Sequence, residues 1–233
     1  MNPLQALIER NLGGIESIVC FASGKGGVGK SILSSACALL LARNGKRVGL
    51  LDLDLHGPSI PHILGLSLSP VEDRGILPPE HRGVKVLSLE FFTRRACPML
   101  GTEIQETLRE IFSITRWGEL DHLLVDLPPG MGEELLEILG LGPKFLVITT
   151  PSSLVWHTAR KLLDLLLRSG AEVLGVVENM VSGEPSTKTE VERMGLKHVS
   201  IGFDPQVEER MGGDFPPPGL SRDVEKMIRE MGI

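Results

Sequence analysis

The residues best suited to chemistry lie in one short stretch near the start of the chain. Residues 23–31 read SGKGGVGKS, which contains the pattern G-x-x-x-x-G-K-[ST]. Glycines let the backbone adopt conformations that other residues avoid, so that successive N–H groups can surround an anion. Lys30 would reach the β- and γ-phosphates of a nucleotide, and the Ser31 hydroxyl would bind Mg²⁺. The stretch predicts a binding site for a nucleoside triphosphate, with a glycine-rich turn that binds nothing as the alternative.

Three aspartates follow apolar segments, at positions from which they could reach the same ligand. Asp126 ends the apolar run 123–125, and Asp52 and Asp54 stand two residues apart after the apolar segment 47–51. Hydrolysis of ATP needs a metal clamp and an oriented water. Asp126 is therefore predicted to contact Mg²⁺ directly or through water. Asp52 is predicted to support the same ion, with capping of its strand end as the alternative.

Alternating apolar segments predict the elements that position these residues. Buried strands of hydrophobic residues alternate with helices of 3.6-residue periodicity, which is typical of a mostly parallel sheet with helices on both faces. Strands are expected at 17–22, 47–52, 84–89, 121–126, 145–150, 173–177 and 198–203, and helices at 4–10, 32–43, 102–115, 133–139, 154–167 and 221–231. Residues 65–83 are expected to form a loop. The motif and the pattern together predict a single-domain α/β P-loop NTPase, with a lead-in at 1–16 and the ATPase domain expected at 17–233.

Composition and charge narrow the range of partners. The 233 residues carry 24 basic and 30 acidic side chains, a net charge of −6, and no basic cluster, which argues against nucleic acid. No apolar run reaches membrane-spanning length and the first residues lack a secretory signal, so a cytoplasmic protein without a membrane partner is expected. Cys20, Cys37 and Cys97 have no metal-ligand spacing, and the first two are expected to be buried apolar residues.

Lys25 is a second lysine, placed directly after the first glycine of the motif. The resulting K-G-G-x-G-K-[ST] pattern resembles the deviant Walker A motif of the MinD, Mrp, ParA and nitrogenase iron-protein class. This resemblance implies a homodimer that sandwiches its nucleotides, in which Lys25 reaches the phosphates of the partner subunit. It also implies that Asp54 orients the attacking water and is the catalytic carboxylate. A solvated loop lysine is the alternative for Lys25.

Further segments resemble the Mrp branch of that class, which includes iron–sulfur cluster assembly ATPases. They are DLDLHGPSIP at 52–61, WGELD at 117–121, DLPPG at 126–130 and VENM at 177–180, with Pro98-Met99 also matching. The resemblance spans about residues 17–180 and implies ATP and Mg²⁺ as cofactors. It implies that Asn179 hydrogen-bonds adenine and that the backbone near Asp204 and Pro205 covers the base, with a turn asparagine as the alternative for Asn179. The residues expected to bind ATP are Gly24, Lys25, Gly26, Gly27, Val28, Gly29, Lys30, Ser31, Asn179, Asp204 and Pro205.

The chain departs from the Mrp pattern after residue 180. Cluster-carrying Mrp proteins have a C-x-x-C pair there, whereas this chain reads VSGEPS at 181–186 and has no cysteine after Cys97. Iron–sulfur clusters need thiolate ligands. The segments EDRG at 72–75, PP at 78–79 and ITRW at 114–117 resemble a second group, the ATPase-type HypB nickel-insertion factors. His56 and His62 lie near the predicted site, and a solvated or packing role is expected for both.

Two functions therefore stay open from the sequence. The first is an ATP-hydrolysing maturation factor for metal centres, acting as a nucleotide-gated homodimer with a metallochaperone or apo-metalloprotein client. The second is a positioning or partitioning ATPase of the MinD and ParA kind, which would need a membrane or DNA anchor. The helix at 221–231 has an apolar face, but its basic residues are offset by acidic ones, so packing against the domain is expected.

Overall fold

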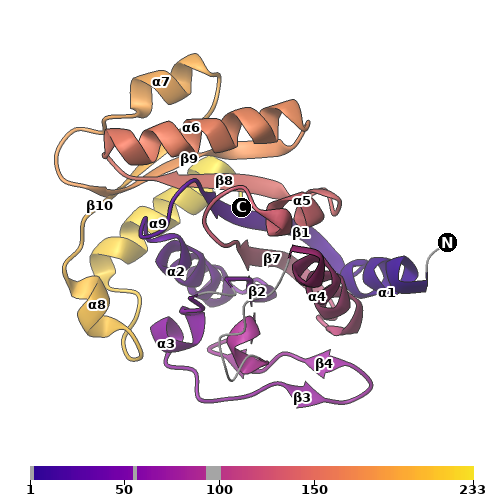
Figure 1. Ribbon diagram of the computed structural model, residues 1–233. Helices are drawn as coiled ribbons and strands as arrows, with labels where there is room; N and C mark the ends of the chain where they lie inside the picture. The colour runs from indigo at the N-terminus through magenta and orange to yellow at the C-terminus, as the bar shows by residue number, and fades with distance from the viewer. Residues whose placement is uncertain (1–2, 55–56, 93–100) are drawn as a thin grey trace.

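The computed structural model describes residues 3–54, 57–92 and 101–233 as an α/β protein built on one large sheet (Figure 1). His56, Cys97 and the Pro98-Met99 pair lie outside the described residues. The helices are α1 (Pro3–Leu12), α2 (Lys30–Arg43), α3 (Ile60–Leu64), α4 (Gly101–Ile114), α5 (Glu133–Leu139), α6 (Ser153–Arg168), α7 (Lys188–Arg193), α8 (Gln206–Arg210) and α9 (Pro218–Met231), with the 3₁₀ turn η1 (Leu89–Phe91).

The strands are β1 (Ile15–Ser23), β2 (Val48–Asp52), β3 (Val71–Glu72), β4 (Ile76–Leu77), β5 (Glu80–His81), β6 (Val84–Ser88), β7 (Leu120–Asp126), β8 (Lys144–Thr149), β9 (Glu172–Val181) and β10 (His198–Gly202). Eight of them form the main sheet in the order β10-β9-β8-β1-β7-β2-β6-β5, and β3 pairs with β4 in a separate hairpin. Every pairing in the main sheet is parallel except that of β5 with β6. The predicted fold class, a mostly parallel sheet with helices, is confirmed.

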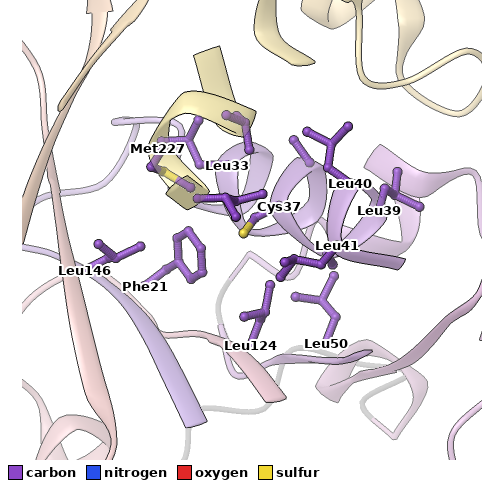
Figure 2. Close-up of a cluster of buried hydrophobic side chains, with 14 of the residues drawn as sticks. Phe21, Leu33, Cys37, Leu39, Leu40, Leu41, Leu50, Leu124, Leu146 and Met227 are labelled. Atoms are coloured by element: carbon purple, nitrogen blue, oxygen red, sulfur yellow. The ribbon is translucent and has the colours of Figure 1, made fainter. Parts of the chain in front are cut away.

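Strand residues alternate between two apolar cores, one on each face of the sheet. On β1, Phe21 enters the first core, together with α2, α3 and α9, while Cys20 enters the second, together with α1 and α4 to α7. Side chains of successive strand residues point to opposite faces, so a strand that is apolar throughout fills both cores. Figure 2 shows Phe21, Leu124 and Leu146 from the sheet packed against Leu33 and neighbouring residues of α2.

The expected loop at 65–83 is partly ordered as strand. Val71–Glu72 and Ile76–Leu77 form the β3–β4 hairpin, and Glu80–His81 pairs with the main sheet. Such two-residue strands are too short to show a periodic pattern, so the prediction of loop was wrong there. Strand β9 is also longer than expected and carries Asn179 within it.

Helix α9 packs its apolar face on the first core, as expected. Val224, Met227 and Met231 are buried, and the helix lies against α2 and β10. None of the helices among the described residues combines the length and apolarity needed to cross a lipid bilayer.

Candidate nucleotide site

The glycine-rich loop connects the end of β1 to the start of α2, at the carboxyl edge of the sheet. Gly29 is the residue that caps α2, and its φ of 83° lies in the left-handed region that side-chain-bearing residues avoid. Gly24 lies against the backbone of Thr158 on α6, where a Cβ atom would meet the Thr158 carbonyl carbon at 2.5 Å. The fold therefore needs glycine at these two positions of the loop.

Lys30 and Ser31 both hydrogen-bond the carboxylate of Asp126. The Lys30 ammonium donates to Asp126 Oδ1 at 2.8 Å, and the Ser31 hydroxyl donates to Asp126 Oδ2. The ion pair is buried, because the Lys30 and Asp126 side chains are 6% and 0% exposed. Burial raises the pKa of Asp126 above its ordinary value, and the Lys30 charge opposes that rise. The three side chains thus place a cation, a hydroxyl and a carboxylate at the first turn of one helix.

Asp52 is a second buried carboxylate, paired in register with Asp126 across β2 and β7. Its Oδ1 accepts the Asp54 N–H at 3.1 Å, and its Oδ2 accepts the Ile60 N–H at 3.3 Å and the Ser88 hydroxyl at 3.1 Å. Burial raises its pKa to about 7, and the neighbouring Asp126 charge acts in the same direction. Asp52 thus caps the end of β2, which is the alternative role considered for it from the sequence. It also lies beside Asp126.

Asp54 and Lys25 lie nearer the surface. Asp54 is partly buried, lines the nucleotide-sized cavity described next, and its Oδ1 accepts the Gly57 N–H at 3.0 Å. Lys25 is exposed, and the Ser23 hydroxyl holds its backbone by donating to the Lys25 carbonyl at 3.0 Å. The exposed Lys25 side chain can extend into solvent, whereas the Lys30 side chain is buried and bound to Asp126.

A cavity of about 410 Å³ opens in front of the glycine-rich loop. Gly26 to Ser31 form one wall, and α3 and α8 contribute the other, through Ile63 and Glu208 among others. A second hollow of about 210 Å³ adjoins it and is lined by Asn179, Phe203, Asp204 and Pro205. Ile32, Met180 and Glu208 line both spaces. The loop residues and the predicted base-side residues are therefore brought to adjacent parts of one groove.

Asn179 contacts the glycine-rich loop directly. Its side-chain amide donates to the Val28 carbonyl at 2.8 Å, and a Cβ atom on Gly29 would lie 2.3 Å from that amide nitrogen. The next residue, Met180, has a φ of 59°, which is uncommon for a residue with a side chain. Asn179 is a strand residue, not a turn residue, and one of its amide hydrogens positions the loop.

Asp204 uses its carboxylate within the protein. Its Oδ1 accepts the Gln206 N–H at 3.0 Å and its Oδ2 accepts the Leu220 N–H at 3.3 Å, so it joins the starts of α8 and α9. Because both carboxylate oxygens of Asp204 accept hydrogen bonds from the protein, a ligand in the second hollow would contact mainly the backbone at Asp204 and Pro205.

The α3 and α8 walls of the cavity are joined through backbone atoms. The Gly212 N–H donates to the Ile63 carbonyl at 3.0 Å, and a Cβ atom on Gly65 would lie 2.5 Å from the Gly212 carbonyl oxygen. The Arg82 guanidinium also donates to the Phe215 carbonyl at 2.9 Å, in the segment between α8 and α9.

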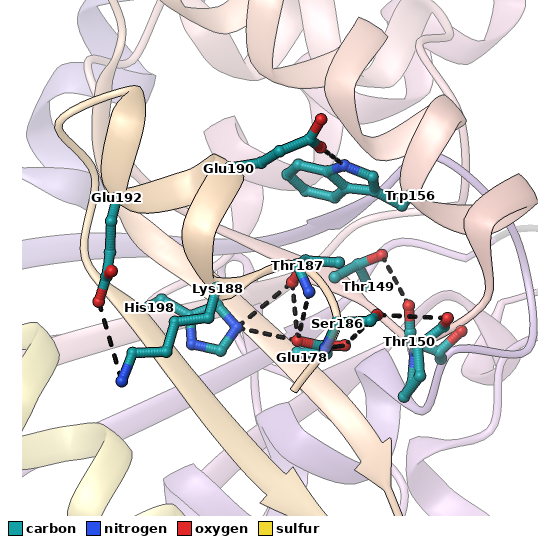
Figure 3. A network of polar contacts seen from close by, with 11 residues as sticks. Thr149, Thr150, Trp156, Glu178, Ser186, Thr187, Lys188, Glu190, Glu192 and His198 are labelled. Carbon is teal, nitrogen blue, oxygen red and sulfur yellow. Dashed lines mark hydrogen bonds and ion pairs between the residues drawn. The ribbon is translucent and has the colours of Figure 1, made fainter. Parts of the chain in front are cut away.

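A polar network behind Asn179 was not expected from the sequence. The buried carboxylate of Glu178 accepts hydrogen bonds from the backbone N–H groups and hydroxyls of Ser186 and Thr187, and lies 3.0 Å from His198 Nε2 (Figure 3). Burial raises the pKa of Glu178, but the hydrogen bonds outweigh it and the pKa is lowered overall. The only sequence signal was the position of Glu178 beside Asn179 in the VENM segment. The network fastens residues 186–187, just after the segment where the Mrp pattern has cysteines, to the strand that carries Asn179.

The donor set suits Mg²⁺ better than a soft metal. Ser31 and Asp126 offer oxygen atoms, the ligands that Mg²⁺ prefers, and the two groups are close enough to hydrogen-bond each other. Among the described residues, no group of three or more His, Cys, Asp and Glu side chains is arranged to hold a metal by itself. Cys20 and Cys37 are fully buried, and burial raises the pKa of both thiols far above the ordinary value, so neither is an available thiolate.

Known proteins of similar sequence align with most of this chain. It is 33% identical over 225 residues to the iron-sulfur cluster carrier protein of Saccharolobus solfataricus, covering 87% of this chain and 76% of that protein. It is 40% identical over 173 residues to the iron-sulfur cluster carrier protein of Bacillus subtilis, covering 72% of this chain. That match covers 49% of the Bacillus protein, so the chain spans about half the length of that relative.

Solved structures show the same fold. A nucleotide-binding protein of Archaeoglobus fulgidus in complex with ADP superimposes with a TM-score of 0.76 at 30% identity, covering 95% of this chain and 93% of the other. The cell division ATPase MinD of Pyrococcus furiosus gives a TM-score of 0.66 at 22% identity, covering 91% and 99%, which shows likeness of fold. The ParA family model, described as NUBPL iron-transfer P-loop NTPase, matches residues 14–201. The chain belongs to this family of P-loop NTPases.

Proposed function

We propose that this chain binds ATP with Mg²⁺, hydrolyses it, and uses the cycle to help mature the metal centres of other proteins. The observation that carries the nucleotide chemistry is the shared contact of Lys30 and Ser31 with the buried carboxylate of Asp126, at the floor of a cavity lined by the glycine-rich loop. The maturation role draws on the relatives named iron-sulfur cluster carrier proteins and on the iron-transfer description of the family.

Each residue has a distinct task in this proposal. The loop N–H groups bind the phosphates, and Lys30 turns from Asp126 toward the β- and γ-phosphates. Ser31 and Asp126, supported by Asp52, would hold Mg²⁺, which when bound neutralises the charge that develops on the phosphate oxygens. Asp54 lines the cavity and accepts a hydrogen bond from the attacking water. Asn179 and the backbone at 204–205 contact the adenine.

Lys25 is the basis for proposing a homodimer. It is exposed and lies next to Gly26, which lines the cavity. A lysine supplied by a second subunit would add positive charge beside the transferring phosphoryl group. The dimer would therefore form with ATP and loosen after hydrolysis.

The metal that the protein handles is the open part of the proposal. Both described cysteines are buried, and residues 98–233 contain no cysteine. A cluster in transit would then need thiolates from the client or another protein. Nickel delivery together with a metal-binding partner is the second form of the same maturation role, suggested by the likeness to ATPase-type HypB.

The nucleotide chemistry is tested by phosphate release from ATP with and without Mg²⁺. Lys30→Ala and Asp54→Ala should each lower turnover by at least about tenfold, the scale of removing one charge or one positioned base from a transition state. Lys226→Ala, an exposed lysine on α9, is the matched control and should leave turnover unchanged. Undiminished turnover in both site variants would remove the proposed ATPase mechanism.

The dimer and the cargo need separate measurements. Light scattering of the Asp54→Ala variant with ATP should show a dimer, and Lys25→Ala in that background should return it to the monomer. Proteins that copurify with ATP-loaded Asp54→Ala should include a metalloprotein or a small metal-binding protein. Recovery of the variant without such a partner would count against the maturation role while leaving the ATPase proposal standing.

A further inference from the structure

The opposite edge of the sheet carries an arginine-rich hollow that the nucleotide chemistry does not use. A space of about 650 Å³ is lined by Arg10, Asn11, Asp73, Arg74 and Arg116. A second space of about 200 Å³ adjoins it and shares Arg10, Asn11 and Arg116. Both lie where α1 leads into β1 and where α4 leads into β7, at the amino ends of these strands. Asp52 and Asp126 lie at the carboxyl ends, so this hollow is remote from the candidate nucleotide site.

Three segments that are far apart in sequence build the hollow. The Arg116 N–H donates to the Ile76 carbonyl at 2.8 Å, and its guanidinium donates to the Asp73 carbonyl at 3.0 Å, which ties the β3–β4 hairpin to the end of α4. Asn11 on α1 donates to the Ser113 carbonyl on α4 at 2.6 Å. In Figure 1, α1, α4 and the hairpin all lie on the same side of the molecule. The arginines are therefore displayed by fixed backbone.

The arginines in the hollow lack the carboxylate partners that a neighbouring arginine has. Arg47, at the same edge, lies within 4 Å of carboxylate oxygens of Glu16, Glu119 and Asp121. Arg116 approaches one carboxylate, Asp73, at 3.8 Å. Arg10 and Arg74 make no ion pair with any of the described residues. A protein with a net charge of −6 thus gathers three guanidinium groups around the larger space, which one carboxylate, Asp73, lines; Glu119 lines the adjoining space.

Helix ends explain part of this arrangement. Arg10 lies in the last turn of α1, and Arg116 follows the end of α4, where the helix dipole favours a cation. Arg74 lies on the hairpin, at no helix end, and still faces the same hollow. The Trp117 indole N–H is a second unexplained group: Trp117 lines the adjoining space, is fully buried, and its Nε1 has no hydrogen-bond partner among the described residues.

The geometry points to a docking site for an acidic segment of a partner polypeptide, with closely spaced carboxylates paired to Arg10, Arg74 and Arg116. Guanidinium groups bind carboxylates through paired hydrogen bonds, and several of them around one hollow select a segment with more than one acid. Asp73 and Glu119, whose side chains are 65% and 76% exposed, confine the positive charge to a short stretch of surface. A short acidic segment can place its carboxylates at the arginines and away from these two groups, whereas a continuous phosphate backbone would have to pass them. The site does not depend on the proposed ATPase cycle, because it lies at the other edge of the sheet.

The test is binding of a fluorescein-labelled tetraglutamate peptide to the full chain at low salt, measured by fluorescence anisotropy. The Arg10→Gln/Arg74→Gln variant should bind the peptide at least about tenfold more weakly, because it removes the two guanidinium groups that make no ion pair with a described carboxylate. The matched control is Arg222→Gln/Arg229→Gln, which removes the same charge from exposed positions on α9 and should bind like the unaltered chain.

Trp117 provides a local signal for the same event. In a Trp156→Phe background it is the sole tryptophan, since the sequence has two. Its fluorescence should change when the peptide binds and should not change with a tetraglutamine peptide. The affinity for ATP should be equal in all variants, which shows that each is folded. If the Arg10→Gln/Arg74→Gln variant binds ATP more weakly, peptide binding is measured instead on Arg10→Gln and Arg74→Gln separately, and each should weaken it.

Three results would overturn the proposal. The first is an equal loss of peptide affinity in the Arg222→Gln/Arg229→Gln control, which would mean that net charge alone accounts for the binding. The second is tetraglutamine binding as tightly as tetraglutamate. The third is inorganic tripolyphosphate binding in preference to the peptide, which would assign the hollow to phosphates.

Discussion

Lys30 and Asp126 form an ion pair that is buried on both sides, so each charge depends on the other. Removing one partner of such a pair leaves an uncompensated charge in the interior, at a cost of about 3–5 kcal/mol. Removing both leaves two neutral groups that can pack or hydrogen-bond. The pair also explains how the free protein tolerates a lysine that is prepared for a phosphate.

A double-mutant cycle at this pair should show strong coupling. Lys30→Met should lower the free energy of unfolding by about 3 kcal/mol, whereas adding Asp126→Asn should cost little more or restore part of the loss. Urea denaturation without nucleotide measures all four proteins. Additive losses in the double variant would mean that the pair is not buried and coupled as described.

Asp52 should make the stability of the nucleotide-free protein fall as pH rises. Its pKa is raised from about 4 to about 7 by burial and the Asp126 charge, so the native state holds a proton that the unfolded chain has released. Between about pH 4 and pH 7 the native state binds more protons, and the free energy of unfolding declines as pH increases. Asp52→Asn should flatten that decline in urea titrations across this range.

The matched control for Asp52 is Asp121, whose pKa moves in the opposite direction. Hydrogen bonds from Arg47 lower the pKa of Asp121 to about 2. Its contribution to stability is complete above its ordinary pKa and disappears as pH falls toward 2. Asp121→Asn should therefore leave the slope between pH 5 and pH 7 unchanged, and a flattened slope in this variant would refute the assignment to Asp52.

At the scale of elements, the glycine-rich loop and β9 depend on each other through Gly29 and Asn179. Gly27 and Gly29 both have positive φ, but a Cβ atom on Gly27 would meet open space, whereas one on Gly29 would collide with the Asn179 amide. Gly27→Ala should cost about 1 kcal/mol of backbone strain. Gly29→Ala should cost more and should also displace the loop.

Thermal unfolding and ATP calorimetry of the two variants check this difference. Gly29→Ala should lose at least about tenfold more ATP affinity than Gly27→Ala, since it also breaks the contact of Asn179 with Val28. Equal effects of the two substitutions would show that loop strain, and not the contact with β9, decides the outcome.

The same elements show what could be predicted from the sequence. The strands ending at Asp52 and Asp126 were predictable because long apolar runs buried on two faces have a strong signal. The family resemblance predicts that Asn179 contacts the nucleotide, but its hydrogen bond to Val28 depends on a contact between residues 151 positions apart, which the sequence does not show. The β3–β4 hairpin and the Glu178 network were missed, because short strands and buried polar partners are specified by tertiary contacts.

At the scale of the whole molecule, α9 closes the first core. Met227 is fully buried between α9 and α2 in the cluster of Figure 2. Met227→Ala should lower the free energy of unfolding by about 2–5 kcal/mol, through lost burial and the cavity that remains. Arg229→Gln, on the exposed side of the same helix, should change it by less than about 0.5 kcal/mol.

This packing also bears on the positioning-ATPase alternative. A helix whose apolar face is used within the domain has little left to insert into a lipid surface. Cosedimentation with anionic liposomes or with DNA, in the presence of ATP, should leave the protein in the supernatant. Pelleting with either would favour an anchor and the MinD and ParA kind of function.

The backbone contact between Gly65 and Gly212 has a kinetic consequence. One glycine follows α3, on the side of the cavity nearest the predicted phosphates, and the other follows α8, on the side of the predicted base. Because no side chain separates them, and because the Gly212 N–H donates to the Ile63 carbonyl, we expect α3 and α8 to move together. In the proposed ATPase cycle, release of ADP should then follow a single exponential in stopped-flow measurements, and Gly65→Leu or Gly212→Leu should divide it into two phases.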